Sequence, residues 1–156
     1  MAKLIPLQRN TRAARTRKNR TLLLPMPKAT TDDLALRVHI ALDAMRRGQG
    51  NVHAAQTLTQ AMILSGFLAE AGYGEATFEQ MRRAEADISE AFDRGRDTGE
   101  WRLDHDAAGR FADIVSTYDF QLRRAPLSAI ADASDRLDRF RAGEPAGPVT
   151  RKRASG

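Results

Sequence analysis

The sequence predicts an all-α protein: a single compact bundle of about five helices over residues 29–143, between basic tails at both ends. Three observations predict this fold class. Apolar residues recur at helical spacing in five segments, residues that start and stop helices flank those segments, and no segment alternates between apolar and polar residues as a strand does. A chain of 156 residues is long enough to enclose one hydrophobic core, so we expect one domain.

The first helix is predicted to start at Thr30 and to end near Arg47. Thr30 and Asp33 have the spacing of a capping box, and Gly48 stops the helix. Its apolar stripe consists of Leu34, Val38, Ala41, Leu42 and Met45.

A second helix is predicted over about 52–71, with Asn51 as its N-terminal cap. Within residues 61–69 only Ser65 is polar, so we expect this segment to be buried nearly all round or to contact a second copy of the chain. Gly66 indicates that another helix approaches this segment closely.

A third helix is predicted over about 78–95, opened by the cap Thr77. Gly95 and Gly99 mark the region where it ends. The loop that follows contains the only tryptophan, Trp101, which we expect to plug one end of the bundle.

The fourth helix, over about 105–124, starts after the cap Asp104, and the fifth is predicted from Leu127 to Arg141. The inward-facing residues of the last three helices are predicted to be Phe78, Met81, Ile88 and Phe92, then Ala108, Phe111, Val115, Tyr118 and Leu122, then Ile130, Ala133, Leu137 and Phe140.

Both ends of the chain are predicted to lie outside the helical domain. Residues 1–28 are interpreted as a flexible basic arm (1–21) followed by an extended strap (22–28), because the prolines of the strap disfavour helix. The three leucines at 22–24 are expected to cover the edge of the core. Residues 144–156 are predicted to be a disordered basic tail.

Charge is divided sharply along the sequence. Residues 1–31 contain eight basic and no acidic side chains, whereas residues 32–143 contain 14 basic and 19 acidic side chains. The last 13 residues are again basic, with a formal charge of +2. The positive net charge of +5 therefore comes from the two ends and not from the helical body.

Basic segments without acids can follow a phosphate backbone and release its counterions, so the ends predict binding to nucleic acid. The arm has no aromatic residue for stacking on single-stranded bases, so we expect non-specific or weakly specific binding. The predicted nucleic-acid-binding residues are Arg9, Arg12, Arg15, Arg17, Lys18, Arg20, Arg151, Lys152 and Arg153.

Residues 41–58 contain a second indication of DNA binding. It is a pattern of four short motifs, in chain order Ala41-Leu42-Asp43, Arg47-Gly48, Gly50-Asn51 and Ala54-Ala55. This pattern resembles the helix-turn-helix of Fis-type bacterial DNA-binding proteins, and the rest of the chain resembles small helical proteins of proteobacterial mobile elements. The first resemblance implies a recognition helix at about 61–70. Such a helix needs polar or basic side chains to reach bases, and this segment has neither Lys nor Arg.

No motif indicates an enzyme. His39 and Asp43 have a possible metal-ligand spacing, but no third ligand lies at a recognisable distance, and there is no cysteine. No run of 18 apolar residues predicts a membrane span, and no secretory signal precedes the domain. We therefore expect a non-enzymatic, cytoplasmic protein without catalytic residue, metal or cofactor.

Two functions remain open from the sequence. The first is a nucleic-acid-associated accessory or regulatory protein that uses its basic arm, with a possible homodimer through residues 61–69. The alternative is a protein-interaction adaptor or inhibitor, made by a phage or other mobile element, that uses the acidic helical surface. A helix-turn-helix transcription factor is a third possibility, and it requires residues 61–70 to be exposed.

Overall fold

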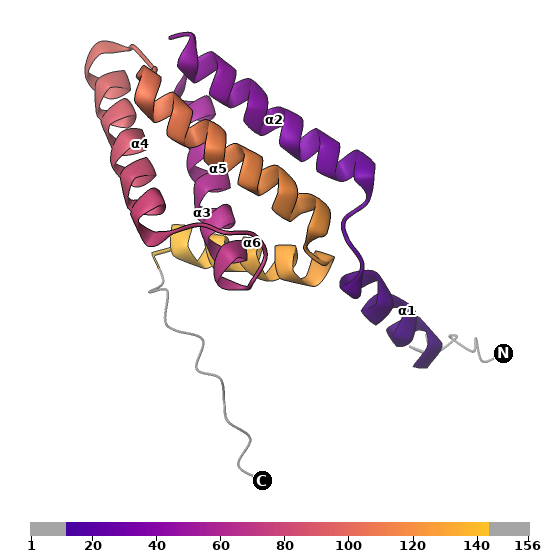
Figure 1. Ribbon diagram of the computed structural model, residues 1–156. Coiled ribbons are helices and arrows are strands. Elements are labelled where there is room, and N and C mark those ends of the chain that lie inside the picture. Colours follow the sequence, from indigo (N-terminus) through magenta and orange to yellow (C-terminus); the bar gives the residue numbers. More distant parts are fainter. Residues whose placement is uncertain (1–11, 144–156) are drawn as a thin grey trace, which may run out of the picture.

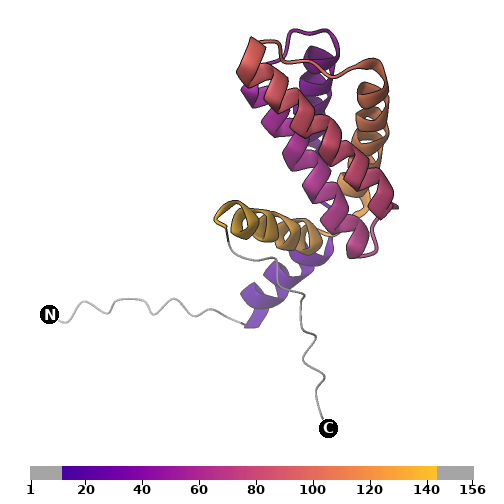
Figure 2. The same ribbon diagram turned by 90° about the vertical axis from the view of Figure 1, so that its left-hand side faces the viewer.

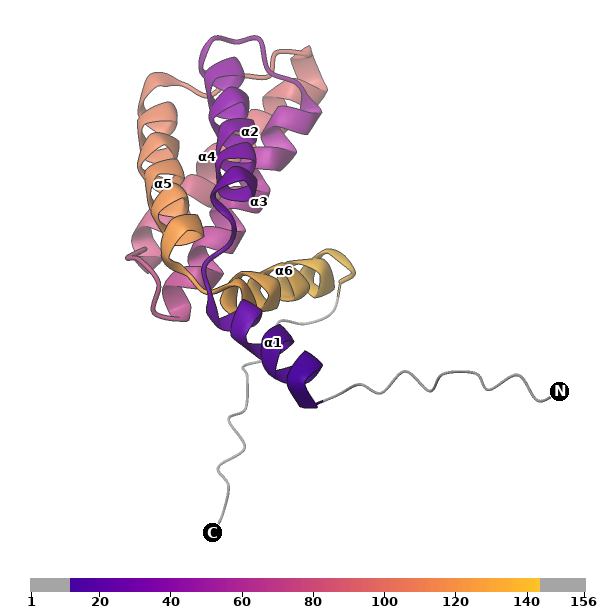
Figure 3. The same cartoon turned by 90° about the vertical axis from the view of Figure 1, so that its right-hand side faces the viewer.

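Four helices of the chain run side by side, a fifth crosses one end of them, and a sixth projects beyond that crossing helix (Figures 1, 2 and 3). The computed structural model describes residues 12–143, and within this range the regular elements are all helices. Their bounds are α1 Arg12–Leu23, α2 Lys28–Arg46, α3 Val52–Glu70, α4 Phe78–Thr98, α5 His105–Arg124 and α6 Leu127–Arg141. The predicted all-α class is confirmed, and the predicted number of helices is one too low.

The additional helix is α1, which forms where a flexible arm was expected. Residues 12–23 contain no glycine or proline, and most of them are good helix formers. α1 has no buried residue, so it lacks the apolar stripe by which a helix is recognised in a sequence. The tail predicted at 144–156 and the start of the arm, residues 1–11, lie outside the described residues.

The core is centred on α3, which packs against α2, α4, α5 and α6. No side chain of residues 61–69 is exposed: Met62, Ser65 and Leu68 are buried, and Ile63 and Phe67 are half-buried. The prediction that this apolar segment belongs to the core is confirmed.

A buried glutamine joins α5 to α3 and to the turn after it. The Nε2 group of Gln121 donates hydrogen bonds to the backbone oxygens of Ser65 and Tyr73, at 2.9 and 2.8 Å. One turn earlier on α5, burial raises the pKa of Tyr118 to about 12, with a further contribution from the neighbouring Asp119 carboxylate. Gln121 and Tyr118 are therefore neutral polar side chains that α5 places in the core.

Three of the four predicted caps are confirmed. The side chains of Asn51, Thr77 and Asp104 each accept a hydrogen bond from the backbone N–H three residues later, at 2.8, 3.1 and 2.8 Å. The predicted cap at Thr30 is wrong, because α2 already begins at Lys28. Pro27 precedes it in an extended conformation and accepts from the N–H of Thr31, so the backbone starts this helix without a side-chain cap.

The predicted strap covers the core less than expected. Leu23 and Leu24 are 72% and 59% exposed, and the side chain of this segment that packs on the core is Met26. Two predicted core residues, Phe78 and Phe140, are also 84% and 52% exposed. Both lie at a helix end, where the apolar periodicity continues but the facing helix gives no cover.

Trp101 lies at one end of the bundle, as predicted, and Gly95 makes room for it. A Cβ atom at Gly95 would be 2.3 Å from the indole ring of Trp101. The ring meets Phe92 edge to face, at 5.6 Å between centroids. Gly95 is therefore a buried position inside α4, which continues to Thr98.

The expected close approach at Gly66 is wrong. A Cβ atom there would meet the Sδ atom of Met81 at 3.7 Å, an ordinary van der Waals contact.

In the described part of the chain, no helix is long and apolar enough to cross a lipid bilayer.

Candidate nucleic-acid interface

The structure places five of the predicted nucleic-acid-binding residues on the single helix α1. Arg12, Arg15, Arg17, Lys18 and Arg20 are all exposed, and α1 contains no acidic residue. Arg9, Arg151, Lys152 and Arg153 lie outside the described residues. The candidate interface is therefore a cationic helix, and whether the C-terminal basic residues join it stays a prediction.

The C-terminal end of α1 is joined to the body by hydrogen bonding just after the helix. Just after the helix, the backbone oxygen of Leu24 accepts a 2.8 Å hydrogen bond from the N–H of Leu127, and Pro25 and Pro126 form an isolated antiparallel bridge. Leu22 is the only half-buried residue of α1. From this junction, where it contacts α6, the helix leads away from α2–α5, and its residues 12–21 are exposed (Figures 1 and 3).

The cations of α1 differ from those of the body in having no counter-charge. None of the five forms an ion pair with a described residue. In the body most arginines are paired, for example Arg37 with Asp33 at 2.9 Å and Arg47 with Asp43 at 3.0 Å. The charge of α1 is therefore available to an external anion.

The same charge pattern works against the helix when no anion is bound. Three pairs of cations stand three residues apart and repel one another: Arg12 with Arg15, Arg15 with Lys18, and Arg17 with Arg20. Arg12 also lies at the positive end of the helix dipole. A helix of 12 residues is marginal in water even without such repulsion. Bound anions would remove the repulsion and stabilise α1.

Residues 61–70, which the helix-turn-helix resemblance implies as a recognition helix, are the last part of the longer helix α3. α3 is continuous from Val52 to Glu70, so no turn separates Ala54-Ala55 from residues 61–69. Those residues are buried or half-buried against the neighbouring helices. Side chains in the core do not reach bases in a DNA groove, so this segment offers no groove-reading surface.

The two residues of the candidate metal spacing on α2 contact different partners. The Nε2 atom of His39 lies 2.6 Å from the Oδ2 atom of Asp119 on α5, and Asp43 instead accepts hydrogen bonds from Arg46 and Arg47. Over residues 12–143, no three histidine or carboxylate side chains come together in a way that would hold a metal ion. His39 thus links two helices.

The acidic side chains of α4 are partly neutralised by arginines of the same helix. Glu79 accepts hydrogen bonds from Arg82 and Arg83 at 2.9–3.2 Å, and the Arg82 contact is the main cause of the lowered pKa of Glu79. Asp93 pairs with Arg96 at 2.7 Å. A partner that recognises this surface by charge would first have to displace these arginines.

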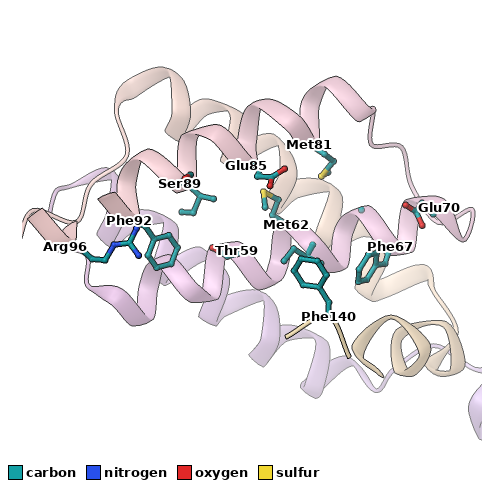
Figure 4. A pocket seen from close by; sticks show the side chains of 13 residues that line it. Thr59, Met62, Phe67, Glu70, Met81, Glu85, Ser89, Phe92, Arg96 and Phe140 are labelled. Atoms are coloured by element: carbon teal, nitrogen blue, oxygen red, sulfur yellow. The ribbon is translucent and has the colours of Figure 1, made fainter. Parts of the chain in front are cut away.

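Sequence reasoning missed an apolar groove between α3 and α4. It has a volume of about 560 Å³. Figure 4 shows Met62 and Phe67 on the α3 side, Met81 and Phe92 on the α4 side, and Phe140 reaching in from α6. All five belong to apolar stripes that were predicted as core. Periodicity alone does not show that α6 stays on one side of α3 and leaves this face of α4 uncovered.

No protein-family model matches the chain, and a search of the curated proteins and of the solved structures gives no significant match.

Proposed function

We propose that this protein binds nucleic acid through the basic helix α1, as an accessory or regulatory protein without catalytic activity. The observation that carries the proposal is the arrangement of charge on α1: five exposed cations, no acid on the helix, and no ion pair to the described body. Phosphate groups supply the missing counter-charge, and the release of condensed counterions drives binding.

The test is the salt dependence of binding. Changing Arg12, Arg15, Arg17, Lys18 and Arg20 together to Gln should abolish binding to mixed-sequence DNA and RNA, measured by fluorescence anisotropy. For the unmodified chain we expect the plot of log K against log salt to have a slope of about −4 to −5 on duplex DNA, and any residual binding of the variant should depend only weakly on salt.

A matched control removes the same amount of charge from the body. Changing Arg37, Arg46, Arg47, Arg82 and Arg83 to Gln removes five positive charges from exposed ion pairs, whose loss costs little stability. This variant should bind nearly as the unmodified chain does. Equal loss in both variants would mean that overall charge, and not α1, is responsible, and unchanged binding in the α1 variant would contradict the proposal.

The groove supports a second proposal, a homodimer through the face that contains residues 61–69. Phe140, 52% exposed, stands beside a hollow lined by Met81 and Ile88. A two-fold symmetric interface places the same patch of both copies face to face, so the second copy would cover the half-exposed Phe140 and the apolar groove that it helps to line.

Sedimentation velocity tests this pairing. Phe140→Asp should convert dimer to monomer, whereas Phe120→Asp, at a similarly exposed phenylalanine on α5, should leave the dimer intact. A monomeric unmodified chain at about 100 μM would contradict the proposal. So would a Phe140→Asp variant that remains a dimer.

A further inference from the structure

The helical form of α1 and the placement of its cations bear on which nucleic acid it binds. We infer that α1 binds double-stranded DNA by lying in the major groove, with cations reaching the phosphates of both strands. This inference rests on the proposed function and adds the nucleic-acid class and the mode of binding.

The cations surround the helix axis. Successive residues of an α-helix are about 100° apart, so Arg12, Arg15, Arg17, Lys18 and Arg20 leave no gap wider than about 100° around α1. A helix that lies flat on one row of phosphates, or on a membrane surface, needs its cations on one side. A helix between two phosphate walls uses them on every side, and the major groove of DNA has two such walls.

The dimensions of α1 agree with those of the groove. Twelve residues make a helix about 18 Å long, and its diameter with side chains, about 10–12 Å, is close to the major-groove width of about 12 Å. α1 buries no residue of its own, and the bond between Leu24 and Leu127 joins its C-terminal end to the body. α1 can therefore enter a groove without unfolding the bundle.

The other polyanions fit α1 less well. The major groove of double-stranded RNA is deep and narrow and does not admit side chains in this way. Single strands are bound through aromatic stacking, and α1 has no aromatic residue. A membrane-binding helix needs an apolar face, whereas Leu22 and Leu23 are the only large apolar residues of α1.

The test separates the helix from its charge. Thr16 lies inside α1, where its hydroxyl donates to the backbone oxygen of Arg12. Thr16→Pro breaks the helix and keeps every cation, whereas the matched variant Thr16→Ala keeps both helix and cations. Anisotropy of the full chain with a 20-base-pair DNA duplex should show affinity at least about tenfold lower for Thr16→Pro and unchanged for Thr16→Ala. Thermal unfolding should be the same in both, because α1 buries nothing.

The inference also requires a preference among probes. The unmodified chain should bind the DNA duplex at least about tenfold more tightly than an RNA duplex of the same sequence, a single strand, or vesicles of phosphatidylglycerol. Full binding by Thr16→Pro, or equal or tighter binding to any of the other probes, would overturn it. If Thr16→Pro binds fully and with the same salt dependence, α1 acts as a charged segment of any shape and the proposed function survives. If the unmodified chain binds no nucleic acid, both proposals fail.

Discussion

Gly95 and Trp101 show how one missing side chain fixes the end of the bundle. The indole ring occupies the space where a Cβ atom of residue 95 would be, and the backbone oxygen of Trp101 accepts a hydrogen bond from the N–H of Gly50 at 3.3 Å. The loop before α5 is thereby joined to the loop between α2 and α3. A glycine inside a helix is unfavourable by itself, so its presence here is explained by the ring that it accommodates.

Gly95→Ala should therefore destabilise the protein by about 1–3 kcal/mol, because the ring has to move and the core is overpacked. Chemical denaturation of the purified protein measures this change in the free energy of unfolding. Gly109→Ala is the matched control: Gly109 lies inside α5, and an added Cβ would meet nothing within 4 Å. That substitution should stabilise by about 0.5–1 kcal/mol. Stabilisation by both substitutions would mean that the ring does not fill the space at residue 95.

At the scale of the elements, capping is the feature with the most direct link from sequence to structure. Asn51, Thr77 and Asp104 act as predicted because each stands where the preceding loop is extended and the helix has no other start. Thr30 is also a residue type that caps helices, and Asp33 follows it at the spacing of a capping box, but Pro27 starts α2 three residues earlier. A spacing pattern predicts a cap only when no stronger start precedes it.

Asn51→Ala should lower the free energy of unfolding by about 1 kcal/mol, because the backbone N–H of Ala54 loses its 2.8 Å acceptor. Thr30→Ala should change it by less than about 0.5 kcal/mol, since Thr30 is an exposed residue within the first turn of α2. Thermal unfolding of both variants side by side measures the difference. An equal loss of stability would show that Thr30 does cap α2.

The helix α1 could not have been placed from its apolar pattern. The other five helices each bury a stripe, and that stripe is the signal that predicted them. α1 buries nothing, so only the intrinsic preferences of its residues and the absence of glycine and proline point to a helix. The proposed nucleic-acid-binding residues were predicted from charge alone, and their helical arrangement came from the structure.

At the scale of the whole molecule, the order of the helices around α3 could not be predicted from the sequence. Five apolar stripes indicate a shared core, but they do not specify which helices touch. α6 crosses the end of the bundle and packs on α3 and α1 (Figure 2), which leaves Phe140 beside the groove. The same contact places α1 outside the bundle. The candidate DNA-binding helix and the candidate dimer face both follow from the position of α6.

If α1 binds a DNA duplex as proposed, its location beyond α6 limits how closely copies of the protein can be spaced along that duplex. A helix about 18 Å long spans only about five base pairs, at 3.4 Å per pair. A folded body of this size is about 35 Å across, or about ten base pairs. On one face of the duplex, neighbouring copies would therefore collide through their bodies before their helices meet. The bodies would then set the site size on that face, and α1 would cover only about half of the DNA length that each copy spans.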